Sequence, residues 1–383
     1  MTSERAACRV ERVETIAAID ALAAEWTALE RLTREATGFQ SYRWCRAWLS
    51  TARENGASLR PRILCIRDDE RLVMLWPLQI EHRFGVGVAR WIGEPMTQYG
   101  DALAAPGEGR ERWRKIAEGE MSRWRDVDLF AFTRLRADSV VAACNARTPA
   151  AGECLAAPFV DLRAMQRRRR KSLERRARRL AELGPTTLAE AQTPAEREEL
   201  TRRALALKRE WLRRKGLVSA GLSSPITEEF LSALAREGFM RVFSLRVAKD
   251  VAALELGFVS SDAYRSLLGC YDPRFAEGSP GQALTGGLIE RCAEEGLATY
   301  DLLLPADAYK LTWATGETPV RAQFRAMTFK GRLAAFALAR LRPMAKRALR
   351  RMAGLRARLN PGKFSFAAAS ASVTTSTRKE KIS

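Results

Sequence analysis

Residues 263–284 read AYRSLLGCYDPRFAEGSPGQAL, and this stretch is the most informative part of the sequence. Residues 263–271 have the apolar and aromatic composition of a β-strand. A turn rich in Ser, Pro and Gly follows and leads into a helix expected over residues 281–295. The first N–H groups of a helix have no partner inside the helix, and the helix dipole adds positive potential there. The stretch therefore predicts a strand, a turn and a helix arranged as an anion site.

The turn itself has residues suited to that role. Ser279 can cap the helix, Pro280 fits its first turn, and Gly281 allows close approach of a ligand to the backbone. The spacing matches neither the P-loop nor the dinucleotide fingerprint, so neither a nucleoside triphosphate nor a dinucleotide is implied. An ordinary helix start would use the same residues, so both interpretations stay open.

The sequence on either side indicates an internal repeat. Residues 62–66 and 72–80 are apolar strands joined by an acidic turn, and residues 241–247 and 252–259 repeat that hairpin pattern. Helices precede both hairpins. The pattern predicts an α/β (α+β) protein with two copies of one unit, joined by a small-residue linker over residues 149–158.

Length and composition agree with a two-unit protein. The chain has 383 residues, of which 46% are hydrophobic and 29% charged, enough to bury a core. The formal net charge of +20 is concentrated in two segments: residues 163–179 carry +9 and residues 330–383 carry +13, leaving −2 for the rest. A near-neutral folded body argues against nucleic acid as the main partner.

Several other classes of protein have little support in the sequence. The N-terminus has no apolar core of a signal peptide, and no stretch is long and apolar enough to span a membrane, so we expect a cytoplasmic protein. The seven cysteines show no C-x-x-C spacing and are expected to be reduced. His82 is the single histidine, which leaves little material for a metal site or a Ser-His-Asp triad, and we expect no metal.

Several motifs together resemble the GNAT-type acyltransferases of the CelD/BcsL-like group, which are similar in architecture to FemAB aminoacyltransferases. They are Tyr-Asp-Pro at 271–273, Ser-Pro-Gly at 279–281 with Leu284, Tyr-Asp-Leu-Leu-Leu-Pro-Ala at 300–306, and Ala-Tyr-Lys-Leu-Thr-Trp-Ala at 308–314. The resemblance extends to Phe39-Gln-Ser with Trp44 and Trp48, to Tyr-Gly-Asp at 99–101 and to the basic helix after the linker. It spans most of residues 10–330.

The resemblance implies two tandem GNAT-like units, each a mixed, mostly antiparallel sheet flanked by helices. Residues 1–155 would be a degenerate unit and residues 156–330 the acyltransferase unit. A basic amphipathic helix over 331–360 and a disordered tail over 361–383 would follow. The implied reaction is direct attack of an acceptor amine on an acyl-CoA thioester, most simply acetyl-CoA, with a link to cellulose or exopolysaccharide synthesis.

The resemblance also assigns the site. The loop before the central helix would cradle the coenzyme A pyrophosphate, and it comprises Ser279, Pro280, Gly281, Gln282, Ala283 and Leu284. Glu255 is the carboxylate on the preceding hairpin and a candidate base for the amine proton, while Tyr271 and Tyr309 are candidate acids. Asp301 and Lys310 are expected to form a cluster with Tyr309. An ordinary structural role for each of these side chains stays open.

Two alternative functions stay open, and the sequence also predicts an acceptor and a membrane-binding segment. A FemAB-like transferase would take an aminoacyl-tRNA, and a nonenzymatic protein would keep the fold to bind membrane or nucleic acid. For the enzyme we expect a small-molecule amine or amino-sugar acceptor. Apolar residues recur every three or four positions over 332–359 with no acid among them, which predicts a helix that binds the anionic inner face of the membrane.

Overall fold

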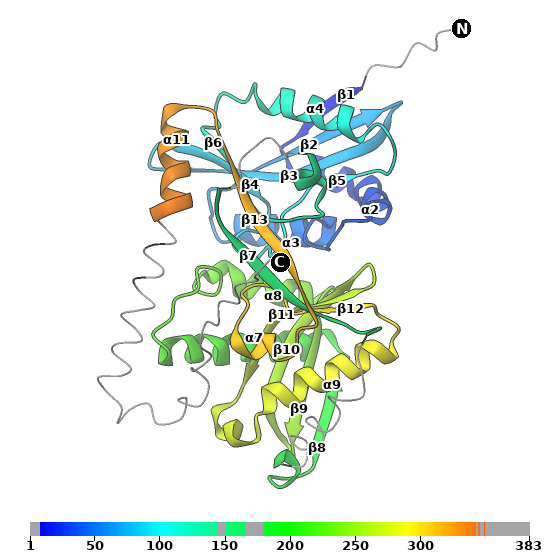
Figure 1. The fold of residues 1–383 in the computed structure, drawn as a ribbon, viewed down its shortest axis with the longest axis vertical. Helices are drawn as coiled ribbons and strands as arrows, with labels where there is room; N and C mark the ends of the chain where they lie inside the picture. The colour runs from blue at the N-terminus through cyan, green and yellow to red at the C-terminus, as the bar shows by residue number, and fades with distance from the viewer. Residues whose placement is uncertain (1–7, 145–150, 165–178, 342–343, 345–347, 349–383) are drawn as a thin grey trace, which may run out of the picture.

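A computed structural model describes residues 8–144, 151–164, 179–341, 344 and 348 (Figure 1). Three sequence predictions fall wholly or largely outside these residues. They are the basic helix beginning at residue 167, the greater part of the amphipathic segment 332–359, and the tail 361–383. In Figure 1 the first half of the chain forms the upper part of the molecule and most of the second half the lower part, while the helix over residues 329–336 (orange) lies beside the upper part.

The first half begins with a strand and helices and then forms the predicted hairpin. Thr15 and Ser41 cap helices by accepting the backbone N–H groups of Ala18 and Trp44. Asp69 in the hairpin turn has a positive φ, as a tight hairpin turn requires. The elements are β1 (Arg9–Val13), α1 (Ile16–Ala21), α2 (Ala23–Leu32), α3 (Tyr42–Glu54), β2 (Arg60–Asp68), β3 (Arg71–Arg83), β4 (Val86–Trp91), β5 (Leu103–Ala104), α4 (Arg110–Met121), β6 (Leu129–Arg136), α5 (Val140–Cys144) and β7 (Ala151–Asp161).

The second half repeats this order. With α1 and α2 taken as one helical segment and the two-residue β5 left aside, both halves read β-α-α-β-β-β-α-β-α-β, which confirms the predicted repeat. The elements are β8 (Thr186–Glu190), α7 (Pro194–Arg214), α8 (Pro225–Arg236), β9 (Arg241–Val247), β10 (Asp250–Ser260), β11 (Ala263–Tyr271), the 3₁₀ helix η2 (Pro273–Gly278), α9 (Pro280–Glu294), β12 (Thr299–Asp301), α10 (Ala308–Leu311) and β13 (Gly316–Ala326). Helix α11 (Phe329–Phe336) and the π-helical turn η3 (Ala337–Leu341) follow.

The strands of both halves join in one sheet of mirror-like order. Apart from β5, which pairs with β3, the order is β1-β2-β3-β4-β6-β13-β7-β12-β11-β10-β9-β8. Among the described strands only β4–β6 and β11–β12 pair in parallel, so the predicted mixed, mostly antiparallel character is confirmed. The last strand of each half pairs with the other half: β7 with β12, and β13 with β6. The two strands cross the middle of the molecule side by side (Figure 1).

This exchange corrects the predicted linker. From residue 151 onward the segment is strand β7, and Ala157 and Val160 are fully buried. Small residues resemble a linker in composition, but here they belong to a strand whose partners β12 and β13 lie more than 130 residues away in the sequence. The expected unit boundaries at 155/156 and 330/331 consequently fall inside β7 and α11.

Aromatic packing holds the two halves together beside the exchanged strands. Aromatic side chains of α3 and of the residues just before it meet α8 and β10 of the second half. The ring centroid of Phe39, just before α3, lies 5.2 Å from that of Phe258, and the ring centroid of Trp48 lies 5.2 Å from that of Phe230, both in edge-to-face geometry. Such pairs contribute about 0.5–1.5 kcal/mol each beyond the area that they bury. The two halves therefore share one core as well as one sheet.

Candidate functional site

The site lies where the parallel strands β11 and β12 separate. They pair only from Ala263 opposite Thr299 to Arg265 opposite Asp301. Strand β12 then ends, while β11 continues to Tyr271. Beyond Arg265, this side of β11 has no strand partner among the described residues. The split therefore leaves backbone polar groups of β11 available to side chains or to a ligand.

Glu255 lies beside this split on β10. Its Cα is paired with that of Gly269 on β11, and the side chain is 3% exposed. The position of Gly269 matters because a Cβ there would lie 3.8 Å from Glu255 Oε2, so both residues face the same side of the sheet. The sequence prediction of a carboxylate on this strand is thus matched by a buried group at the edge of the split.

The surroundings of Glu255 suit a base that works near neutral pH. Burial raises the pKa of Glu255 to about 7, although hydrogen bonds from Tyr300 and Ser266 favour its charged form. The Tyr300 hydroxyl donates to Oε1 of the carboxylate. Tyr264 and Tyr300 have ring centroids 5.1 Å apart where β11 and β12 still pair, and they close the bottom of the split. Glu255 can therefore exchange a proton in the physiological range.

Asp301 and Lys310 both contact the backbone of Leu303. The Asp301 carboxylate accepts the Leu303 N–H at 2.9 Å, and Lys310 Nζ donates to the Leu303 carbonyl at 3.1 Å. No ion pair joins the two side chains in the described part of the chain. Asp301 also accepts the Tyr99 hydroxyl of the first half at 3.0 Å. This cluster consequently ties the split to the other half of the molecule.

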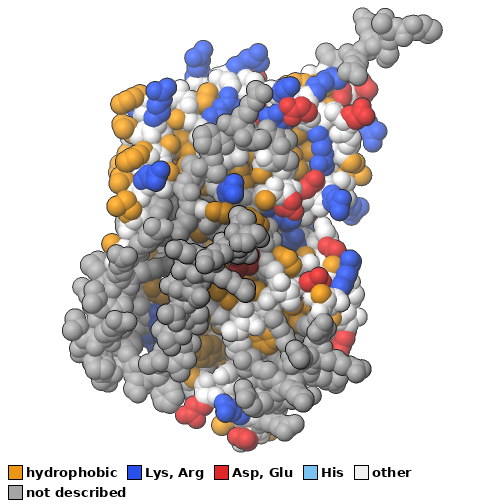
Figure 2. Space-filling model, in the orientation of Figure 1, with side chains coloured by type: hydrophobic (Ala, Val, Ile, Leu, Met, Phe, Trp, Pro, Cys, Tyr) orange, Lys and Arg blue, Asp and Glu red, His pale blue; other side chains and the backbone are white. Residues whose placement is uncertain are grey.

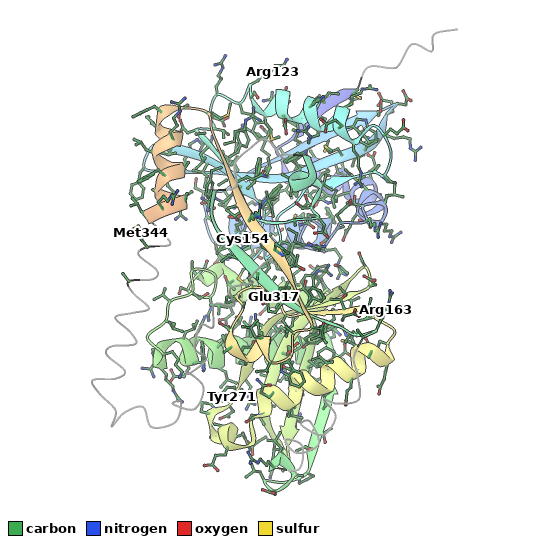
Figure 3. The ribbon with its side chains drawn as sticks, viewed as in Figure 1. Arg123, Cys154, Arg163, Tyr271, Glu317 and Met344 are labelled. Carbon is green, nitrogen blue, oxygen red and sulfur yellow. The ribbon has the colours of Figure 1, made fainter. Side chains whose placement is uncertain are left out.

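The two candidate acids lie at different places. Tyr309 is 40% exposed, and partial burial together with the charge of Glu255 raises the pKa of its hydroxyl. Tyr309 therefore stays protonated at neutral pH and belongs to the electrostatic surroundings of Glu255. Tyr271 lies at the far end of β11, beside the start of α9 (Figure 3), where its ring is 3.6 Å from the position of a Cβ on Gly281.

The start of α9 retains features of an anion site. Ser279 precedes the helix with φ 53° and ψ 51°, and Pro280 is its first residue. The backbone N–H groups of Gln282 and Ala283 already donate to the Ser279 carbonyl, which leaves the Gly281 N–H as the donor at the helix start. No acidic residue occupies the first turn. Pro280 and Leu284 are buried, so their side chains pack in the core.

Lys208 is a site residue that the sequence analysis did not identify. It comes from α7, and its Nζ donates to the Gly269 carbonyl on β11 at 3.0 Å. A sequence signal was present: the buried Thr201, Ala204 and Leu205 define the inward face of α7, and Lys208 continues it at helical spacing. A lysine on an apolar face is the pattern that would have singled it out.

Residues 167–311 match the sequence profile of a family described as "Acetyltransferase (GNAT) domain". No curated protein matches the chain. The described residues contain no group of three or more His, Cys, Asp or Glu side chains arranged to hold a metal ion.

Among solved structures, FemX is similar, with a TM-score of 0.54 at 12% identity, covering 81% of this chain and 96% of that one. The L-PGS of Bacillus licheniformis has a TM-score of 0.53 at 13% identity, covering 83% and 95%. The C-terminal domain of a putative lysylphosphatidylglycerol synthetase from Agrobacterium fabrum has a TM-score of 0.51 at 13% identity, covering 84% and 95%. At these identities the likeness is one of fold. The profile match and the fold together identify residues 167–311 as a GNAT acyltransferase domain.

Proposed function

We propose that the protein is an acyl-CoA-dependent N-acyltransferase, with acetyl-CoA as the simplest donor. The observation that carries the proposal is Glu255, a buried carboxylate with a pKa raised to about 7 beside the open edge of β11. A carboxylate with that pKa is suited to take the proton from an attacking amine. We propose a small-molecule amine or amino sugar as the acceptor. From the resemblance to the CelD/BcsL-like group, we further propose a link to cellulose or exopolysaccharide synthesis.

The other residues of the split have complementary roles in this proposal. The donor supplies an activated acyl group. The Gly281 N–H and the start of α9 would hold its pyrophosphate, since the first turn of α9 has no acid to repel an anion. Unpaired N–H groups on the open edge of β11 would stabilise the developing oxyanion. Tyr309, whose raised pKa keeps it protonated, is our first candidate for the acid and Tyr271 the second.

The experiment compares two glycine substitutions by thermal shift with acetyl-CoA. Gly281→Val places a branched side chain where the phosphates are proposed to bind, and a Cβ there meets only Tyr271 at 3.6 Å, so the fold should survive. Gly119→Val is the matched control in α4, where nothing lies within 4 Å. We expect wild type and the control to be stabilised by acetyl-CoA and Gly281→Val not to be. Equal stabilisation of all three would contradict the proposed cofactor position.

An aminoacyl-tRNA donor is the second candidate. The observation that favours it is the net charge of +9 over residues 163–179, which directly precede β8 of the acyltransferase domain. Gel retardation with bulk tRNA, run beside the acetyl-CoA thermal shift, separates the two donors. Salt-sensitive tRNA binding without any acetyl-CoA effect would favour the second candidate.

We also propose that α11 holds the enzyme on an anionic membrane surface. One face of α11 packs on the sheet, where Gly331 adjoins the Asp128 carbonyl. The other face exposes Phe329, Leu333 and Phe336 by 71, 58 and 57%. Figure 2 shows hydrophobic side chains along this edge of the upper half, with Lys and Arg among them. The described residues include no helix able to cross a bilayer.

Liposome flotation tests the membrane proposal. Leu333→Ser with Phe336→Ser removes most of the exposed apolar face, and Val218→Ser, which removes an exposed apolar side chain elsewhere, is the control. We expect wild type and control to float with anionic vesicles at low salt and the double variant to float less. Each basic residue near such a surface adds about 1 kcal/mol, so high salt should weaken flotation. Flotation equal in all three proteins would contradict the role of α11.

A further inference from the structure

Two lysines, Lys208 half-buried and Lys310 buried, donate to the backbone on the two sides of the split between β11 and β12. Lys208 reaches from α7 to the Gly269 carbonyl on the open edge of β11. Lys310 reaches from α10 to the Leu303 carbonyl, just after the end of β12, and is 7% exposed. Each ammonium has three N–H donors and gives one of them to a backbone carbonyl. The two cations therefore keep donors available on the two sides of the same opening.

Within the part of the chain that the structure describes, neither lysine forms an ion pair with an acidic side chain. In the described ranges, no Asp or Glu oxygen lies within 4.0 Å of either ammonium, although the Lys208 ammonium does lie 4.8 Å from the centroid of the Trp211 ring. Burying a cation without a counter-charge is costly, so a structural role alone gives no reason to keep two of them. A ligand with negative charge would supply the missing partner.

The pKa shift of Lys310 indicates that the two ammonium groups lie close together. Burial, together with the charge of Lys208, lowers the pKa of Lys310 to about 8. The groups that oppose this effect are Asp307, Asp301 and Glu255. Burial likewise lowers the pKa of Lys208, against the charges of Cys270 and Asp307. Lys310 is consequently a cation at neutral pH and becomes neutral as the pH rises through about 8.

We propose that Lys208 and Lys310 form an anion clamp that binds a carboxylate or phosphate group of the acceptor, next to the amine that is acylated. The inference rests on the proposed function in assigning the anion to the acceptor. Gly269, whose carbonyl binds Lys208, is the residue paired with Glu255 across β10 and β11. An acceptor amine at Glu255 would thus place a neighbouring anionic group at the lysines. The acceptor class is an amino acid or a phosphorylated amino sugar.

The donor phosphates have a different proposed place. The start of α9 follows β11 after η2, and Tyr271 separates it from Gly269 along the strand. A donor bound at Gly281 would bring its acyl end, and not its phosphates, to the split. The anion at the lysines should therefore bind together with acetyl-CoA rather than compete with it.

The test uses the full-length protein and isothermal titration with two matched pairs of amines. Glycine is compared with glycinamide, and glucosamine 6-phosphate with glucosamine, so that each pair differs in the anionic group. The variants are Lys208→Met and Lys310→Met, which keep the apolar stem of each side chain. Lys215→Met, at the exposed end of α7, is the control. Titrations are run with and without saturating acetyl-CoA, and a melting curve of each variant verifies folding.

We expect wild type and Lys215→Met to bind the anionic member of at least one pair at least tenfold more tightly than the member without the anionic group. Each clamp variant should reduce that preference at least tenfold, and raising the pH from 7 to 9 should weaken it. An unchanged preference in folded Lys208→Met and Lys310→Met would overturn the clamp. Loss of binding when acetyl-CoA is added would instead assign the anion to the donor and overturn its assignment to the acceptor. Failure of acetyl-CoA itself to bind would contradict the proposed function and leave the lysine comparison measurable.

Discussion

The two halves of the chain contain the same split between parallel strands, and they fill it differently. In the first half, β4 pairs with β6 only at Val88 and Ala89. Trp91 follows at once, 1% exposed, and its indole N–H donates across the split to the Thr133 carbonyl at 3.1 Å. Trp76 and Phe132 pack on its ring with centroids 6.1 and 5.1 Å away. An aromatic plug closes this split.

In the second half, the corresponding split contains Glu255, Lys208 and Lys310 in place of indole rings. Helix α4 of the first half carries Glu111 in its first turn, whereas α9 has no acid there. Apolar filling favours stability, and buried charge opposes it. Under the proposed function, the first unit would serve as a scaffold, whereas the second would keep costly polar groups for chemistry.

The sharpest way to break the comparison is to neutralise one buried glutamate in each half. Glu255→Gln should lower kcat/KM for acyl transfer from acetyl-CoA by about 10²–10⁴-fold, because the base is lost while the shape is kept. Glu81→Gln is the control, since Glu81 is buried on β3, the counterpart of β10. Its activity should stay close to wild type. Equal losses in both variants would mean that Glu255 acts through stability.

The aromatic plug should matter for stability and not for binding. Trp91→Ala removes a fully buried indole and should lower the free energy of unfolding by about 3–5 kcal/mol. Trp91→Phe keeps a ring in place and should cost less, chiefly the hydrogen bond to Thr133. Urea unfolding followed by circular dichroism measures both. If Trp91→Ala folds normally but loses the acetyl-CoA thermal shift, the first split takes part in binding and the scaffold interpretation is wrong.

Removing a single oxygen atom should weaken the contact between the two halves. Tyr99→Phe removes the hydroxyl that donates to the buried Asp301 carboxylate. We expect the unfolding free energy to fall by about 1–3 kcal/mol, because Asp301 loses a partner that cannot be replaced by water. Asp301→Asn in the same background should recover part of the loss, since a neutral amide is cheaper to bury than a carboxylate. A full loss in the double variant would place the effect elsewhere in the Tyr99 packing.

The smallest expected effect is a pH dependence. The pKa of Glu255 is raised from its ordinary value of 4.5 to about 7, so the folded protein holds this proton more tightly than the unfolded chain does. Its contribution to stability is therefore fully present below pH 4.5 and is lost as the pH rises through 7. Activity should rise over the same range as the base ionises. Melting temperatures and kcat/KM between pH 5.5 and 8.5 should show both trends in wild type, and neither in Glu255→Gln.

Local sequence determined the elements of the site. The apolar and aromatic composition of residues 263–271 predicts a strand and the Ser-Pro-Gly at 279–281 predicts a helix start, and both were found where predicted. The two repeated hairpins were likewise predicted from local sequence. These features depend on side chains within a few residues of one another, so periodicity and turn chemistry are sufficient to predict them.

Only the tertiary structure decided which of these elements meet. Three features join residues that are far apart in the sequence. They are the exchange of β7 and β13 between the halves, the hydrogen bond from Tyr99 to Asp301, and the hydrogen bond from Lys208 to the Gly269 carbonyl. The residues that they join lie 61 to more than 200 positions apart or belong to different halves. Residue 151 onward resembled a linker because its strand partners are remote. The physical reason is that strand pairing and burial are set by long-range packing, whose free energy no local pattern contains.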